Sequence, residues 1–300
     1  MSGQIMKVAI LGGYGKMGSW FARVLLGEGL QVVIAGRDRA KLEQAARELG
    51  CSCASNEEAV RQADAVILSV PIDSFETIVR EIAPFVRPGQ YIFDITSVKA
   101  QPVEIMHKYL SACRVLGTHP MFGPGADGIA GQHFVLTPTD DAEESLAVQI
   151  RGYLDDRGAE VAIMSPAEHD ELMSIVLGLS HFIALVSADT LLSLGKLKEA
   201  AGVSGSSYRL LLTLAEAVVS EDPVFYSTLQ MSLPGMAKIE EIFLAKADSW
   251  LDLVRNGDRE NFARRMNYLK SKFTTDDPGF ADAYKRAYRV LGKGDELCGE

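Results

Sequence analysis

Cysteine is scarce in this chain, and the cysteines are not spaced as in zinc sites or CxxC redox pairs. The 300 residues include four cysteines: Cys51, Cys53, Cys113 and Cys298. No CxxC pair occurs, and the Cys51-Ser-Cys53 spacing differs from the spacing typical of zinc sites. We therefore expect reduced thiols, no metal site and a cytoplasmic protein.

The chain also lacks an excess of basic residues. Thirty Lys and Arg stand against 40 Asp and Glu, which gives a net charge of −10. Because nucleic acids and anionic membrane surfaces bind to basic faces, this balance argues against both as partners. A small anionic substrate stays compatible with it, since a few local Arg or Lys residues suffice to bind one.

No apolar run of membrane-spanning length is free of polar residues. The most apolar stretch, 175–194, is interrupted by Ser180, His181, Ser187, Asp189 and Thr190. This favours a buried helix over a membrane span. The first six residues are short and polar and lead straight into a strand-like segment, so we expect no signal peptide. With 47% hydrophobic and 23% charged residues, the chain has the composition of a soluble protein of about two domains.

Hydrophobic periodicity divides the chain into two halves. Up to residue 163, segments of helical spacing alternate with strand-like runs at 8–11, 31–35, 65–70, 91–95, 115–116, 133–137 and 160–163. That alternation indicates a parallel sheet with helices on both faces. After Pro166 nearly every segment has helical spacing. We therefore predict a doubly wound, Rossmann-type α/β domain over 1–165, an all-α domain over 166–292 and a tail over 293–300.

A glycine-rich loop follows the first predicted strand. Its sequence, GGYGKMG, contains GxGxxG at Gly13, Gly15 and Gly18, in the first turn of a βαβ unit. That context predicts dinucleotide binding, and a glycine-rich turn without a ligand is the alternative. The doubled glycine leaves the register of the turn open by one residue. The predicted cofactor-binding residues are Gly12, Gly13, Tyr14, Gly15, Lys16, Met17 and Gly18.

The end of the second predicted strand bears on the choice of dinucleotide. If that strand ends at Ala35, Gly36 stands where an acid would bind the ribose 2′-hydroxyl of NAD. Arg37 then stands where the 2′-phosphate of NADP would lie. Asp38 is a competing acid, but it has the features of an N-cap of the next helix. We favour NADP, with NAD possible; a solvated surface arginine is the alternative interpretation of Arg37.

Polar residues follow two later strands of the predicted sheet. The segment DITSVK covers 94–99, and GTHPMFGP covers 117–124. Ligands of open α/β sheets bind outside the carboxyl ends of the strands, so Ser97, Lys99 and His119 are candidates to contact a substrate. We place His119 on a strand-end loop and interpret it as a catalytic candidate, with a structural histidine as the alternative.

Taken together, four segments resemble one family. GGYGKMG, DITSVK, THPMFGPG and the later EHDELMSIVLGLSHF are similar to prephenate dehydrogenase and its relative arogenate dehydrogenase. The resemblance runs from the glycine loop to at least Met231. It implies a 6-phosphogluconate-dehydrogenase-like arrangement of domains and a homodimer through the helical domain. We expect the monofunctional form, without a chorismate mutase segment.

The resemblance also implies an activity and the residues that perform it. The activity is oxidative decarboxylation of prephenate to 4-hydroxyphenylpyruvate in tyrosine biosynthesis, with tyrosine as a possible inhibitor. His119 corresponds to the family's catalytic base, and Ser97 to a serine that binds the substrate hydroxyl or orients the base. Three residues correspond to substrate-binding positions: Arg209, His181 and Lys99.

Each substrate-binding assignment has a structural alternative. Lys99 fits a structural ion pair, Arg209 a surface arginine on an amphipathic helix, and His181 a satisfied core histidine. We favour binding for Arg209, because an apolar helix has few reasons to bury a lone arginine. We interpret His169 and Asp170 as domain-junction packing or a helix start, not as chemistry.

Rival functions remain. The sequence does not separate prephenate from arogenate. Other enzymes of the same architecture are β-hydroxyacid dehydrogenases, imine or pyrroline reductases and deazaflavin-linked NADP reductases, but none of these calls for a His-Pro pair after a DxxSxK segment. A non-enzymatic NADP-sensing protein is the rival outside enzymology.

Overall fold

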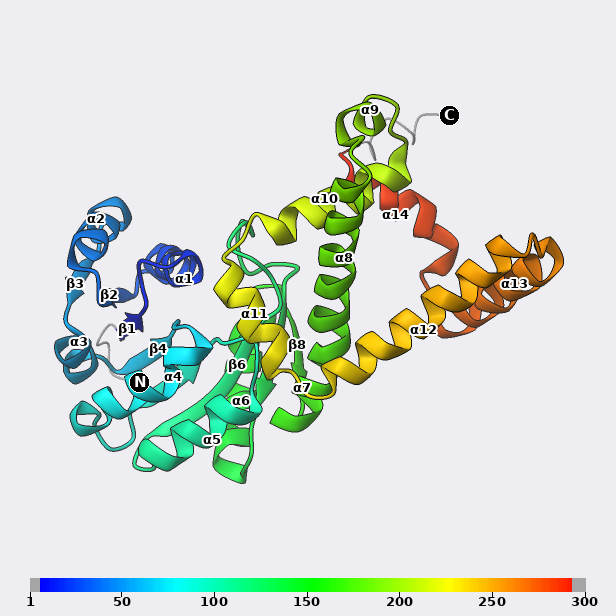
Figure 1. Ribbon diagram of the computed structural model, residues 1–300. Coiled ribbons are helices and arrows are strands. Elements are labelled where there is room, and N and C mark those ends of the chain that lie inside the picture. The colour runs from blue at the N-terminus through cyan, green and yellow to red at the C-terminus, as the bar shows by residue number, and fades with distance from the viewer. Residues whose placement is uncertain (1–5, 293–300) are drawn as a thin grey trace. The chain divides into compact units, whose positions relative to one another are not determined.

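The computed structural model describes residues 6–292, so the predicted tail over 293–300 lies outside the described residues (Figure 1). The chain forms two compact units. The first unit comprises the chain up to Met173 together with Ser232–Pro234, and the second comprises Ser174–Met231 and the chain from Gly235 onward. The division falls inside the helical run that begins at Pro166, the residue at which the sequence places the start of the second domain.

The first unit contains an eight-stranded sheet with the strand order β3-β2-β1-β4-β5-β6-β7-β8. All neighbouring strands are parallel except β6 and β7, which pair antiparallel. This order confirms the predicted Rossmann-type sheet, apart from its one antiparallel pair. The strands are β1 (Lys7–Leu11), β2 (Gln31–Ala35), β3 (Ser52–Ala54), β4 (Ala65–Leu68), β5 (Tyr91–Asp94), β6 (Arg114–Pro120), β7 (His133–Thr137) and β8 (Glu160–Ile163).

Helices cover both faces of this sheet. One apolar cluster packs α3, α4 and α5 against it, around the fully buried Phe75, Ile82 and Met106. A second cluster packs α1 and α2 through Ala22 and Leu42. Each fully buried large apolar side chain contributes about 1.5–3 kcal/mol to folding. The helices are α1 (Lys16–Gly27), α2 (Arg39–Leu49), α3 (Asn56–Gln62), α4 (Ile72–Ile82), α5 (Ala100–Tyr109), α6 (Asp141–Asp155) and α7 (Pro166–Met173), with a 3₁₀ turn at Ala83–Phe85.

The second unit is helical throughout the part that the structure describes. It begins with a π-helical segment, Ser174–Leu179, which runs directly into α8 (Ser180–Ser193), and α10 packs along α8. The remaining helices are α9 (Leu197–Gly202), α10 (Ser206–Val219), α11 (Pro223–Ser232), α12 (Met236–Arg255), α13 (Arg259–Asp276) and α14 (Ala283–Val290), with a 3₁₀ turn at Phe280–Asp282.

The most apolar helical run is not buried in the single chain, contrary to our expectation. Ile175 is 55% exposed, and Leu192 and Leu194 are 65% and 68% exposed. By length and composition alone, Pro166–Ser193 is the one described run that could cross a membrane, with a mean hydropathy of 1.9. The sequence pattern indicated that this helical run has an apolar surface, but it could not show that no other part of the described chain buries it.

Candidate active site

The glycine loop joins β1 to α1 and fits tightly into the first unit. Gly12 has a φ of +79°, and a Cβ there would lie 2.0 Å from the Ser69 carbonyl oxygen. A Cβ at Gly18 would lie 2.5 Å from the Gly12 carbonyl oxygen, and one at Gly13 would lie 2.5 Å from Ile34 Cβ. Both glycines of the doubled pair are therefore required by packing, which explains why the loop begins one residue earlier than GxGxxG.

The start of α1 suits a pyrophosphate. Gly15 is its N-cap, no side chain caps the helix, and its first turn carries no acidic residue. The first amide groups of a helix have no partner within the helix, and together with the helix dipole they attract anions. Lys16 and Met17 form the beginning of this helix. The loop and the helix start thus fit the phosphate groups of a dinucleotide.

The strand register at the end of β2 agrees with the placement used above. β2 ends at Ala35, and its carbonyl oxygen accepts hydrogen bonds from the Gly12 and Gly13 amides at 2.8 and 3.1 Å. The Asp38 side chain accepts from the Lys41 amide at 3.1 Å and caps α2, as predicted. Asp38 is therefore occupied as a cap, and the position after the strand is Gly36, with Arg37 exposed beside it.

His119 lies within β6, and our placement of it on a loop was wrong. It is the next-to-last residue of the strand, opposite Val135 of β7, and it is 4% exposed. The sequence suggested a shorter strand at 115–116, because glycine and proline weaken the strand pattern. Antiparallel pairing with β7 extends the strand and holds the imidazole rigidly.

A chain of hydrogen bonds leads from His119 to the start of α5. His119 Nδ1 lies 2.8 Å from His169 Nε2, and His169 Nδ1 lies 2.7 Å from Asp170 Oδ1. The Asp170 carboxylate also accepts from the backbone amides of Lys99 and Ala100, at 2.7 and 2.9 Å. His169 and Asp170, which come from α7, are thus partners of the catalytic candidate. We interpreted them as domain-junction packing or a helix start; they do lie near the start of α7, and they also bond the catalytic candidate, which that interpretation left out.

The chain of hydrogen bonds determines where each imidazole carries its proton. A carboxylate only accepts, so His169 must donate from Nδ1, and its Nε2 must then accept. His119 donates to that nitrogen from Nδ1, which leaves the lone pair of its own Nε2 available. Donors at a helix start are the partners that a carboxylate prefers. The arrangement therefore presents His119 Nε2 as a proton acceptor.

Electrostatics reinforce this role. Burial lowers the pKa of His119 well below its usual value, and the nearby Lys99 ammonium lowers it further. Burial also lowers the pKa of His169, although the hydrogen bond to Asp170 partly offsets the effect. Both imidazoles are neutral near pH 7, and only a neutral imidazole can take a proton.

Lys99 forms the structural ion pair that we gave as the alternative to substrate binding. Its side chain is fully buried, and the ammonium donates to Asp94 Oδ1 and, at 2.6 Å, to the Thr118 carbonyl oxygen. Thr118 precedes His119 in β6, and its hydroxyl donates to the Asp94 carbonyl oxygen at 2.6 Å. The Lys99 side chain therefore links the end of β5, through Asp94, to β6, the strand that carries His119. Ser97 lies half-buried in the bend between β5 and α5.

The other two predicted substrate-binding residues belong to the second unit. His181 lies in the first turn of α8, and its ring contacts the Tyr226 ring edge-to-face at 4.7 Å. Its buried Nδ1 finds no hydrogen-bond partner in the described chain, and burial lowers its pKa. It is therefore not the satisfied core histidine of the alternative interpretation. Arg209 is exposed on α10, so our burial argument for it was wrong.

Further polar groups of the second unit are also buried without a partner in the described chain. Gln230 of α11, one turn after Tyr226, donates to the Gly178 carbonyl oxygen at 2.9 Å, but its own Oε1 is buried without a partner in the described chain. Tyr208, next to Arg209, has a buried hydroxyl in the same condition. Buried unsatisfied groups are uncommon in native proteins, and a bound ligand is one way to satisfy them. The π-helical turn before His181 is another feature enriched at functional sites.

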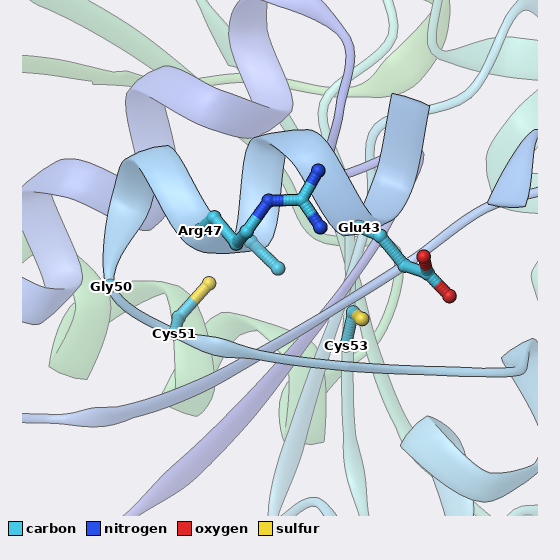
Figure 2. Close-up of a pocket in the computed structure, with 6 residues that line it drawn as sticks. Glu43, Arg47, Gly50, Cys51 and Cys53 are labelled. Atoms are coloured by element: carbon cyan, nitrogen blue, oxygen red, sulfur yellow. The ribbon is translucent and has the colours of Figure 1, made fainter. Parts of the chain in front are cut away.

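Two surface hollows lie elsewhere in the first unit. One, of about 420 Å³, lies beside the edge strand β3 and is lined by Glu43, Ala46, Arg47, Gly50, Cys51 and Cys53 (Figure 2). The other, of about 510 Å³, lies at the start of β6, the end opposite His119, and includes His107 and Glu143. No predicted site residue lines either. Among residues 6–292, no group of three or more His, Cys, Asp or Glu side chains is arranged to hold a metal ion.

Comparison with known proteins relates both units to one family. Residues 21–163 match the family described as the nucleotide-binding domain of prephenate dehydrogenase. Residues 165–268 match the one described as its dimerization domain.

Two curated relatives align with most of the chain. A probable arogenate/prephenate dehydrogenase of Methanocaldococcus jannaschii is 33% identical over 272 residues, which cover 89% of this chain and 61% of that protein. The T-protein of Haemophilus influenzae is 30% identical over 280 residues, which cover 91% of this chain and 68% of that protein. The chain thus spans about three fifths to two thirds of the length of these relatives.

Solved structures share the fold. Prephenate dehydrogenase from A. aeolicus, in complex with hydroxyphenyl propionate and NAD+, has a TM-score of 0.76 and 22% identity, with 92% of this chain and all of that chain covered. Synechocystis arogenate dehydrogenase has a TM-score of 0.69 and 20% identity, with 90% of this chain and 99% of that chain covered.

Proposed function

The chain belongs to the prephenate dehydrogenase family, and from that premise we propose that it oxidises and decarboxylates prephenate to 4-hydroxyphenylpyruvate, with NADP+ as hydride acceptor. The observation that supports this best is the buried, neutral His119 with a free Nε2 lone pair. Arogenate is the second candidate substrate, since both names occur among the relatives.

The glycine loop and the start of α1 would hold the phosphate groups of the cofactor, and its nicotinamide would supply the hydride acceptor. His119 Nε2 takes the proton of the ring hydroxyl while the carbon that bears it loses a hydride, and the C–O bond becomes a carbonyl. The ring carboxylate leaves as carbon dioxide, and its bonding electrons complete the aromatic ring. As the ring becomes aromatic, the π electrons of the carbonyl return to its oxygen. That oxygen takes the proton back from the His119 imidazolium, so the product carries a phenolic hydroxyl and no net proton is released.

Other side chains bind and orient the substrate in this proposal. The Ser97 hydroxyl, in the bend between β5 and α5, hydrogen-bonds the ring hydroxyl or orients His119. Arg209 supplies the cation for a carboxylate, because a guanidinium binds one through two parallel hydrogen bonds. His181 supplies an uncharged hydrogen-bonding group, in keeping with its unsatisfied Nδ1 and lowered pKa.

Steady-state turnover tests this function directly. Prephenate, arogenate and a panel of β-hydroxyacids are each combined with NADP+ and NAD+, and cofactor reduction is followed by absorbance. We expect the largest kcat/KM for prephenate with NADP+. Turnover of a β-hydroxyacid without turnover of either cyclohexadiene substrate would favour the rival dehydrogenases, and nucleotide binding without any turnover would favour a sensing protein.

We also propose a homodimer formed through the second unit. The exposed apolar side chains of α8 and α12, such as Leu192 and Leu251, need a cover, and the matching family domain is described as a dimerization domain. Sedimentation at micromolar concentration is expected to give a species of twice the 32.6 kDa chain mass. A single species of chain mass would contradict this prediction.

Replacing Arg209 by alanine is expected to raise the KM for prephenate and leave the Kd for NADP+ unchanged. Loss of a charge-assisted hydrogen bond weakens binding by about 1.5–3 kcal/mol, or roughly ten- to a hundredfold. Arg255→Ala, which removes another exposed arginine of the second unit, serves as the matched control. Equal KM values for the two variants would show that Arg209 does not bind the substrate.

A further inference from the structure

The Tyr14 ring lies against the backbone of Gly36. A Cβ at position 36 would lie 2.4 Å from Tyr14 Cε1 and 2.8 Å from Cδ1, much closer than any Cβ approaches another carbon. Tyr14 belongs to the glycine loop, and Gly36 is the first residue after β2. Position 36 therefore tolerates only glycine as long as the ring stays where it is.

The Tyr14 ring also packs against apolar side chains. It packs against the apolar cluster between the sheet and helices α1 and α2, which includes Ile10 and Ile34. The loop itself is tied to the end of β2, because the Gly12 and Gly13 amides both donate to the Ala35 carbonyl oxygen. Rotating the ring away would expose apolar surface, and shifting the loop would break these hydrogen bonds, so a side chain at position 36 would disturb one or the other.

Position 36 is also the place where a carboxylate would bind the ribose 2′-hydroxyl of NAD and repel the 2′-phosphate of NADP. Tyr14 thus excludes that acid by steric contact. The nearest alternative acid, Asp38, is engaged in capping α2 and pairs with Lys41 at 3.8 Å. Asp38 is thus already engaged with groups of its own helix.

One cation beside this position remains available. Arg39 pairs with Glu43 at 2.8 Å, and Lys41 pairs with Asp38. Arg37 is exposed and makes no ion pair with any residue between 6 and 292. Arg37 directly follows Gly36 in the sequence. Because Gly36 has no side chain, a phosphate bound beside it would meet no negative charge from that position.

We propose that Tyr14 and Gly36 act as one specificity-determining pair, in which the tyrosine ring excludes an acidic side chain and leaves the edge of β2 open for a 2′-phosphate that Arg37 binds. This inference deepens the cofactor preference and rests on the proposed function for the identity of the cofactor. It makes selectivity a property of two residues together: changing Gly36 alone damages the loop, whereas changing it together with Tyr14 alters the choice of cofactor.

The test is a double-mutant cycle read by titration calorimetry with NADP+ and NAD+, without substrate. Gly36→Asp alone is expected to weaken binding of both nucleotides by about tenfold or more, because the new side chain displaces the loop. Tyr14→Ala alone keeps a preference for NADP+. The double variant regains NAD+ affinity by about tenfold over Gly36→Asp and binds NADP+ more weakly than NAD+. Arg37→Ala loses about ten- to a hundredfold in NADP+ affinity and none in NAD+ affinity.

Two further variants guard against a merely unfolded protein. Gly36→Ala adds only the clashing Cβ and should lose nucleotide affinity. The Tyr14→Ala/Gly36→Ala double variant should recover the affinity that the single variant loses. Thermal unfolding is recorded for each variant. Additive effects of the two substitutions, or a gain of NAD+ affinity by Gly36→Asp alone, would overturn the inference. Wild-type protein that prefers NAD+ would do so as well. Absence of prephenate turnover with normal NADP+ binding would instead remove the proposed function and leave the pair intact.

Discussion

Replacing His119 by asparagine is expected to lower kcat by about 10²- to 10⁴-fold, the usual contribution of a general base, while the Kd for NADP+ stays unchanged. Asparagine has a similar size and can still donate to His169 Nε2, so the hydrogen-bonded chain to Asp170 persists. It has no lone pair of comparable basicity to take the proton of the ring hydroxyl. The loss should therefore appear in kcat and not in KM.

The pH dependence of kcat/KM provides a second measurement on the same residue. Burial lowers the pKa of His119 well below the usual value of 6.5, so the neutral, active form persists as the pH falls below 6.5. The wild-type enzyme should keep its activity between pH 6 and 7. The activity should then fall at lower pH, where the imidazole gains a proton. This acid limb should be missing in the asparagine variant.

His133→Asn is the matched control, because His133 is an exposed histidine on the neighbouring strand β7 and pairs only with Glu160 at 3.5 Å among the described residues. It should leave kcat and the acid limb unchanged. If the His119 variant keeps near wild-type kcat and the same acid limb, His119 is not the base, and His181 becomes the next candidate.

Features that depend on neighbours in the sequence were predicted well. The end of β2 at Ala35, the Asp38 cap and the glycine loop all follow from signals within a few residues. Each is a local matter of backbone conformation or of a side chain that bonds a nearby amide. The tight contacts of Gly12 and Gly36 with distant residues explain why those positions are glycine, but no local pattern could show what they touch.

Features that depend on distant pairing were missed. β6 reaches His119 only because β7 pairs with it antiparallel, and the sequence alone does not show which strands are neighbours. His119 and His169 are 50 positions apart, and nothing in the sequence around either indicates the other. The ion pair between Lys99 and Asp94 is closer in sequence, but its complete burial depends on the strands around it. For the same reason, our assignment of Lys99 to substrate binding followed the motif and not its environment.

The second large effect is expected at Asp170, which touches neither substrate nor cofactor in our proposal and acts as a positioning residue. Asp170→Asn replaces a group that only accepts by one that also donates. The carboxylate oxygens accept from the amides of Lys99 and Ala100 and from the Nδ1 of His169. Whichever way the asparagine side chain is turned, its NH₂ group faces a donor that it cannot satisfy.

When that NH₂ group faces His169, the proton positions along the chain reverse. The amide donates to His169 Nδ1, His169 donates from Nε2 to His119 Nδ1, and the proton of His119 moves to Nε2, the atom that must accept. In this orientation we expect kcat to fall by about 10²-fold or more with little change in KM, since a wrong tautomer blocks general-base catalysis and the matching change in serine proteases lowers kcat by about 10⁴-fold. Nitrogen NMR shifts of the two imidazoles should show the reversed tautomers.

A merely structural role for Asp170 would give a different result. Glu168→Gln is the matched control. Glu168 lies on the same helix as Asp170, is exposed, and its carboxylate accepts a hydrogen bond from the Ser165 amide at 2.9 Å. It should reproduce any general loss of helix stability without changing the tautomers or kcat. If Asp170→Asn lowers the thermal unfolding temperature but leaves kcat and the imidazole shifts of the folded protein unchanged, Asp170 only anchors α7 to the start of α5. If kcat falls together with the tautomer change, the free lone pair of His119 depends on a carboxylate two hydrogen bonds away.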